Sequence, residues 1–262
     1  MATDPELVEA YQRVVAAIPS LRDATVPAPG AVEHPGSVLV DRDWLAARIA
    51  DTARRWACED VRVSATLWWY SASSTLLSVP ASMLLATGLA PDPALDGLTC
   101  TLRPDGYLGT IRSEAGIHDD EVLAARLGAA LAPIIAALSE LSGAGVRSLW
   151  AIATDSLGNR ALDAGTALGG PVLGSALAVR LADLIGAEMP RPRFVDVGRG
   201  GPAGADPCGA PAPGSRRVIR RSSCCLIYET EPDPVAAEGV KCTSCPRQQP
   251  SVRAARLGAL LG

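Results

Sequence analysis

The chain has 262 residues, of which 48% are hydrophobic, and its formal net charge is −4 at pH 7. A chain of this length can bury a substantial core, and its negative charge gives it no general attraction for nucleic acid. No apolar leader of the signal-peptide type follows Met1, so we expect a cytoplasmic protein whose thiols stay reduced. Clustered cysteines in such a protein indicate ligands, not a disulfide framework.

The N-terminal part of the chain predicts helices. Residues 4–18 place apolar side chains at helical spacing, and Asp4 is a suitable N-cap for them. A second helix is expected over residues 41–58. The proline-rich segment between the two, residues 19–37, is expected to be a loop.

A run without charged residues extends from Val63 to Pro91 and is long enough to span a bilayer. It contains many Ser and Thr residues, and Pro80 lies in its middle. We therefore expect two buried helices, over residues 60–77 and 80–88, and no integral membrane segment. A peripheral position at the inner face of a membrane stays open.

The pattern then changes to alternation of apolar and polar residues. Residues 96–113 alternate on both sides of the turn sequence Pro104-Asp105-Gly106, which predicts a β-hairpin with Cys100 on its core face. Three further helices and a short strand are expected after it, over residues 119–141, 146–164, 169–185 and 190–197.

Glycine and proline mark the expected domain organisation. Residues 1–197 form a helix-rich body that we expect to bind substrate, and the Gly/Pro-rich residues 198–215 form a flexible linker. Residues 216–262 form a small C-terminal segment that closes with a short helix over 251–261. The fold class is α+β: a helix-rich body with a β-hairpin, and a cysteine-rich appendage.

Four of the seven cysteines lie in the C-terminal segment, as Cys224-Cys225 and, after sixteen residues, Cys242-Thr-Ser-Cys245. Four thiolates can close a zinc site or an iron–sulfur site, and spacing alone leaves both open. Adjacent side chains of an extended strand point to opposite faces, so the first pair can share one centre only if the backbone turns there. No ligand role is expected for the remaining three: Cys58, Cys100 and Cys208.

The cysteine pattern resembles that of the FhuF-like ferric siderophore reductases. The matching residues are Arg220-Arg221-Ser-Ser-Cys224-Cys225-Leu-Ile-Tyr228 and Cys242-Thr-Ser-Cys245-Pro246. The resemblance covers only this segment, and the gap between the two cysteine pairs is longer here than is typical of the family. It implies a [2Fe-2S] cluster held by Cys224, Cys225, Cys242 and Cys245.

The resemblance also implies the reaction, a one-electron reduction of siderophore-bound Fe(III) to Fe(II). Siderophores hold Fe(III) through hard oxygen donors that suit Fe(II) less well, so reduction releases the iron. The chain shows no glycine motif for a nucleotide, so electrons are expected from a separate reductase, a reduced flavin or a ferredoxin. The alternatives are a zinc-stabilised binding protein without redox activity and a ferredoxin-like electron carrier.

Two groups of residues are candidates for contact with substrate. One is a run of arginines before the first cysteine pair, which forms either a cationic rim for an anionic chelate or donor, or a solvated strand edge. Its members are Arg216, Arg217, Arg220 and Arg221. The other is Trp68 with Trp69, which either line a substrate pocket or belong to the core.

Overall fold

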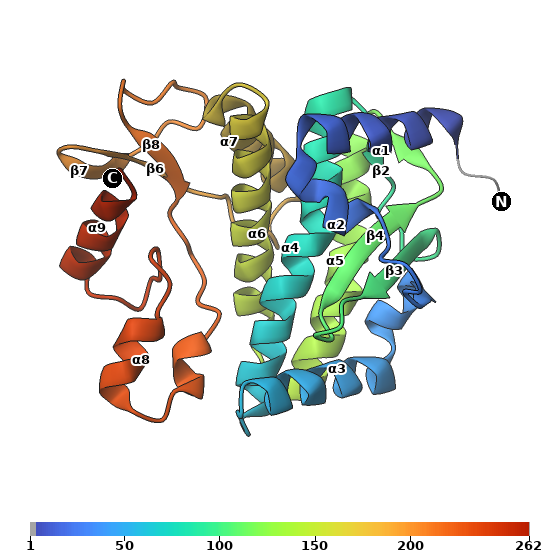
Figure 1. The fold of residues 1–262 in the computed structure, drawn as a ribbon, viewed down its shortest axis with the longest axis horizontal. Helices are drawn as coiled ribbons and strands as arrows, with labels where there is room; N and C mark the ends of the chain where they lie inside the picture. Colours follow the sequence, from blue (N-terminus) through green and yellow to red (C-terminus); the bar gives the residue numbers. More distant parts are fainter. Residues whose placement is uncertain (1–3, 262) are drawn as a thin grey trace.

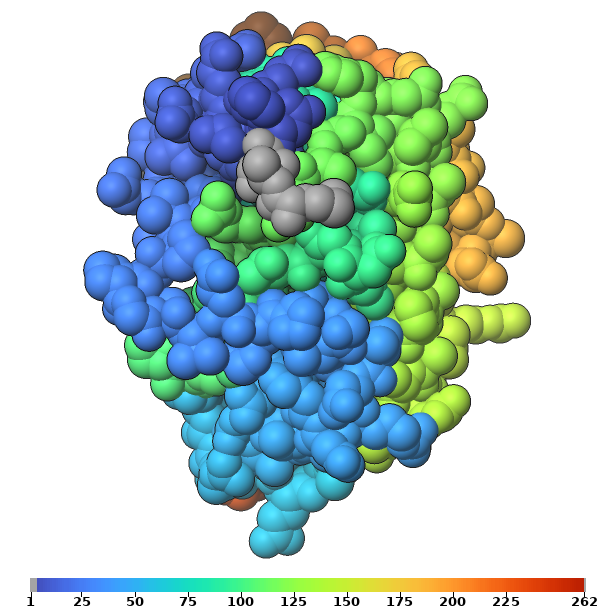
Figure 2. Space-filling model, turned by 90° about the vertical axis from the view of Figure 1, so that its right-hand side faces the viewer, coloured from blue at the N-terminus to red at the C-terminus, as the bar shows by residue number. Residues whose placement is uncertain are grey.

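The fold is known from a computed structural model that describes residues 4–261. It is a helix-rich α+β protein, as the sequence predicts. The C-terminal part of the chain (orange to red) lies along one side of the helical body (Figure 1). The face turned away from it is formed by the first part of the chain (blue), by green segments in its centre and by α5 (yellow-green) (Figure 2).

The body is built from long helices with well-defined ends. They are α1 Pro5–Ala17, α3 Arg42–Arg55, α4 Val61–Thr87, α5 Asp120–Ser142, α6 Val146–Ala167 and α7 Pro171–Ile185. The side chains of Asp4, Asp41, Asp60 and Asp119 cap four of these helices by accepting from backbone N–H groups. Each cap stands where the apolar periodicity begins, which is why the sequence located these helix starts well.

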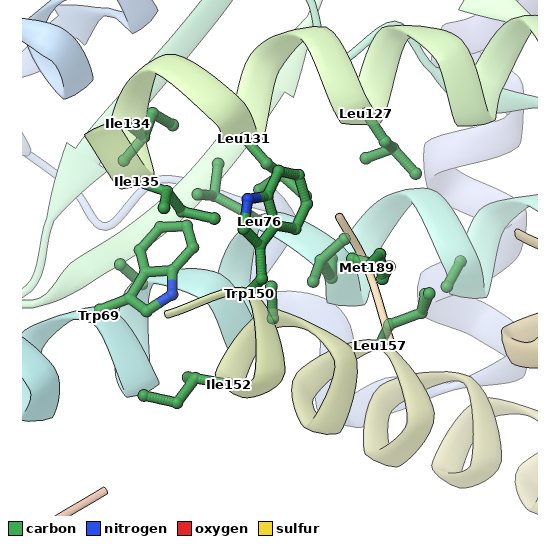
Figure 3. Close-up of a cluster of buried hydrophobic side chains, with 14 of the residues drawn as sticks. Trp69, Leu76, Leu127, Leu131, Ile134, Ile135, Trp150, Ile152, Leu157 and Met189 are labelled. Carbon is green, nitrogen blue, oxygen red and sulfur yellow. The ribbon is translucent and has the colours of Figure 1, made fainter. Parts of the chain in front are cut away.

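The core lies where α4, α5, α6 and α7 meet. Figure 3 shows Trp69, Leu131, Ile135 and Trp150 interleaved at this point. Trp69 is fully buried, and its indole N–H donates to the carbonyl oxygen of Leu149 over 2.8 Å. The polar atom of this large side chain is thereby satisfied inside an apolar core.

Pro80 does not divide the uncharged run, contrary to our expectation of two helices. Residues Val61–Thr87 form the single helix α4, with Pro80 buried inside it. A proline removes one helical hydrogen bond and strains the preceding turn. Here α1, α3 and α6 all pack against α4, so tertiary packing holds the helix together through the proline.

Two small sheets complete the body. The predicted hairpin is confirmed as β3 Leu98–Leu102 and β4 Leu108–Ser113, with Cys100 fully buried. The segment expected to be a loop instead contributes α2 Arg22–Thr25, the 3-10 helices η1 Pro19–Leu21 and η2 Gly36–Val40, and β1 Glu33–Pro35, which pairs with β3. The second sheet pairs β2 Ala90–Pro91 with β5 Gly116–Ile117.

The third sheet stands before the cysteine segment. It comprises β6 Phe194–Gly198, β7 Gly201–Gly204 and β8 Arg216–Ile219 in the order β7-β6-β8. The expected flexible linker, residues 198–215, therefore contains a strand. Arg217 holds this segment in place by donating hydrogen bonds to Asp196 (2.8 Å) and to the carbonyl oxygen of Gly209 (2.8 Å). The division into domains stays a prediction.

The cysteine segment itself has little regular structure. After β8 come the 3-10 helix η3 Ile227–Thr230, then α8 Pro234–Val240, α9 Pro250–Gly258 and the 3-10 turn η4 Ala259–Leu261. The predicted closing helix corresponds to α9 and η4.

One helix, α5, is long and apolar enough to cross a bilayer when the described residues are judged by length and composition. Of its most apolar stretch, 44% is buried inside the protein, and core helices meet the same criteria.

Candidate functional site

The fold brings the four clustered cysteines together. The sulfurs of Cys224 and Cys245 lie 3.7 Å apart, although sixteen residues separate the two cysteine pairs. Cys225 and Cys245 are buried, while Cys224 and Cys242 are half-buried. All four are free thiols. The site is therefore anchored inside the protein and has an edge that reaches the surface.

A backbone turn makes the unspaced pair usable. Leu226 adopts a left-handed conformation, with a φ of 63°. This conformation is unfavourable for a residue with a side chain, and burial of Leu226 beside Val63 and Leu67 of α4 compensates. The backbone N–H groups of Leu226 and Ile227 act to lower the thiol pKa of Cys224 and of Cys225, respectively. The backbone thus turns at the Cys224-Cys225 pair, as the two side chains require in order to share one centre.

Arg221 is the cation of the site. Its guanidinium Nη1 donates to the sulfur of Cys242 over 3.0 Å, and its side chain is only 2% exposed. The guanidinium lies over the ring of Tyr70, 4.8 Å from the ring centroid, and its Nε is 3.5 Å from Asp155. Among the described residues, Nε and Nη2 have no hydrogen-bond partner. Buried positive charge therefore faces the sulfurs.

Asp155 ties the cysteine segment to the helical body. It lies on α6, is 1% exposed, and accepts from the backbone N–H groups of Ser222 (2.9 Å) and Ser223 (2.9 Å). The Ser223 hydroxyl donates to the same carboxylate over 2.5 Å. These contacts fix the backbone just before Cys224. A buried carboxylate with this many donors is a structural anchor.

The thiols have different electrostatic surroundings. A hydrogen bond from the Cys224 thiol lowers the pKa of Cys225, and the cation of Arg221 acts in the same direction. The same hydrogen bond, together with burial, raises the pKa of Cys224. Burial also raises the pKa of Cys242, although Arg221 opposes this. Since the thiolate is the form that binds metal, Arg221 favours the ligating state.

The arrangement fits an iron–sulfur centre. Within residues 4–261, no three His, Cys, Asp or Glu side chains converge closely enough to hold one metal ion. A [2Fe-2S] centre takes two thiolates on each of its two irons, so it requires sulfurs in pairs. The sulfurs of Cys224 and Cys245 already form such a pair, and Cys225 and Cys242 both lie beside Arg221.

Comparison with known proteins supports this fit. Residues 221–247 match the model of the FhuF 2Fe-2S C-terminal domain, a stretch that begins at Arg221 and includes all four cysteines. The resemblance found in the sequence is thereby confirmed, and a [2Fe-2S] cluster is the cofactor of this segment. The match suggests a function of the siderophore-iron reductase type. No curated protein and no solved structure gives a match to the chain.

The other predicted site residues are scattered. Arg217 is buried in its ion pair with Asp196, while Arg216 and Arg220 are exposed. Of the four arginines expected to form a rim, only Arg221 contacts a cysteine. The run is therefore not one continuous cationic surface, because neighbours on a strand point to opposite faces.

Trp68 and Trp69 do not fit the substrate contact considered for them. Both are fully buried in the core of the body. Their place agrees with the alternative of core packing. Asp155 is not among the predicted site residues, although the sequence shows it as a lone carboxylate in the apolar stretch of α6.

Proposed function

We propose that the protein reduces siderophore-bound Fe(III) to Fe(II) by single-electron transfer from a [2Fe-2S] cluster held by Cys224, Cys225, Cys242 and Cys245. The observation that supports this most directly is the pairing of the Cys224 and Cys245 sulfurs, 3.7 Å apart, with Arg221 in contact with the sulfur of Cys242. When bound, the cluster supplies one electron at a time, and the Fe(II) formed is a poorer partner for hard oxygen donors.

The chain's own residues prepare the site for this task. Arg221 offsets the negative charge of the thiolates, which favours the reduced and more negative state. The burial of Cys225 and Cys245 limits access of water, while half-buried Cys224 leaves an edge that a chelate can approach. A separate electron donor and a cytoplasmic location, where such donors are kept reduced, complete the proposal.

The test is an absorption spectrum of protein purified without oxygen, with iron, sulfide and zinc determined on the same sample. We expect a red-brown protein with visible bands that bleach on addition of dithionite. The matched control is Cys242→Ala, which leaves the segment one ligand short and is expected to lose the bands. A colourless wild-type protein that carries stoichiometric zinc would overturn the proposal.

A further inference from the structure

A cavity of about 620 Å³ opens beside the cysteine site. Its wall includes Cys224 and, next to another cysteine, Pro246. The lining also includes the start of α6, around Gly145 and Ser148. We call it the arginine cavity, because its lining includes the three arginines Arg62, Arg147 and Arg247.

The charge of the arginine cavity is not balanced within the protein. Arg147 and Arg247 are exposed, and neither lies within 4.0 Å of a carboxylate oxygen among residues 4–261. Arg62 is paired with Asp60 and Glu229, so it contributes less net charge. No Asp or Glu belongs to the described lining. The cavity therefore presents two unpaired cations to a ligand.

The start of α6 adds further donors on the same side. Its N-cap is Gly145, which has no side chain to satisfy the first backbone N–H groups of the helix. The positive end of the helix dipole therefore lies at the lining of the cavity. Ser148 and Ser222 add hydroxyl groups to the lining. All of these groups favour an anion with several oxygen atoms.

A second cavity near the segment is less suited to electron transfer. Its volume is about 520 Å³, and its lining includes Arg193, Arg220, Arg221 and Arg253 but no cysteine, so it reaches the site only through Arg221. The arginine cavity is lined by Cys224 itself. An electron leaves a cluster most readily toward an acceptor that touches a ligand, so the two cavities are not equivalent.

We propose that the arginine cavity binds the ferric chelate, and that Arg147 and Arg247 select chelates of net negative charge. This rests on the proposed function for its purpose, but its test does not depend on electron transfer. Carboxylate and catecholate chelates share the required chemistry, since both present charged oxygen atoms around the metal. Charge attraction at close range to two arginines also speeds their encounter.

Binding of redox-inert Ga(III) complexes to the cluster-loaded protein tests the proposal. The probes are the anionic Ga(III) complex of a tris-catecholate ligand and the neutral Ga(III) complex of a trihydroxamate ligand of similar size. Calorimetry measures Kd for wild type and for Arg147→Gln/Arg247→Gln. We expect the double variant to bind the anionic probe at least about tenfold more weakly, and the neutral probe within about twofold of wild type.

The matched control is Arg199→Gln/Arg253→Gln. It removes the same charge from an exposed turn and from the second cavity, so it is expected to leave both Kd values unchanged. Equal loss in both double variants would overturn the proposal by showing a general charge effect. Wild-type protein that binds both probes equally well would overturn it too, and would leave the proposed reduction standing. If binding follows the prediction but no chelate is reduced, the proposed function fails, while the assignment of the arginine cavity as a binding site for anionic chelates stands.

Discussion

The helical body and the cysteine segment are held together by different forces. The body has a continuous apolar core in which Trp69, Leu131 and Trp150 are almost fully buried. The cysteine segment has two small apolar clusters, one around Cys225 and Leu226 and one around Leu257, and it depends on the buried charges of Asp155 and Arg221. The comparison indicates that the body folds by hydrophobic burial, whereas the segment needs its cofactor and its polar anchors.

The largest effect is expected from loss of a cysteine ligand, which should affect the cysteine segment and leave the helical body unchanged. Cys245→Ala removes a buried thiol of the site and is expected to abolish the visible absorption of the cluster. The helices of the body do not use this residue, so the far-ultraviolet circular dichroism of the variant should stay close to that of wild type. Cys208→Ala, at an exposed position outside the site, is the control and should keep the cluster. Loss of helical signal in Cys245→Ala would show that the regions are not independent.

The next largest effect is expected at Asp155, which anchors the cysteine segment to the helical body. Asp155→Ala leaves Arg221 as a buried charge without its carboxylate, and we expect the segment to lose about 3–5 kcal/mol of stability. Limited proteolysis should then cleave near the cysteines while the body stays intact.

Asp196→Ala is the matched control for the anchor, because it breaks the other buried arginine pair, with Arg217 in the third sheet. It should expose the segment around 198–215 but leave the cluster bands in place. Proteolytic cleavage near the cysteines in both variants would contradict a specific role for Asp155.

A substitution confined to the helical body should instead destabilise the body itself. A Cβ atom added at Gly174 would lie 1.9 Å from the carbonyl oxygen of Ala161, so Gly174→Ala must push α7 away from α6. We expect a loss of about 1–3 kcal/mol in the free energy of unfolding.

The control for this change is Gly128→Ala on α5, where the nearest atom is 3.6 Å away and alanine is the better helix former. It should be neutral or stabilising. Thermal unfolding of both variants, followed by circular dichroism, checks the pair. Equal midpoints would show that the contact of α6 with α7 tolerates a larger residue.

The smallest expected effect is on the reduction potential of the cluster, and it concerns Arg221, which lies between the helical body and the cysteines. Arg221→Gln removes the cation beside the sulfur of Cys242 and is expected to lower the reduction potential of the cluster by about 100 mV. Arg221→Lys keeps a charge and should show a smaller shift. A redox titration followed by electron paramagnetic resonance measures both. An unchanged potential in Arg221→Gln would mean that Arg221 only supports the fold.

The sequence was most informative where the signal is local. Capping aspartates such as Asp41 located helix starts, and the resemblance of the cysteine pattern to a known family located the cofactor segment. It was misleading at Pro80, because packing around α4 outweighs the local cost of proline. It also could not show that Arg221 is buried or that Arg147 lines the same cavity as Cys224. Both facts depend on contacts between segments that are distant in the chain.

The most direct test of the central claim counts electrons and iron together. Reduced wild-type protein, freed of excess dithionite, is mixed without oxygen with ferric carboxylate, hydroxamate and catecholate chelates in turn. Cluster absorption and Fe(II) captured by a ferrous chelator are recorded in parallel. We predict that at least one chelate reoxidises the cluster, with one Fe(II) formed for each electron lost. A cluster that stays reduced with every chelate, while a ferredoxin-type acceptor reoxidises it, would contradict the claim and indicate an electron carrier.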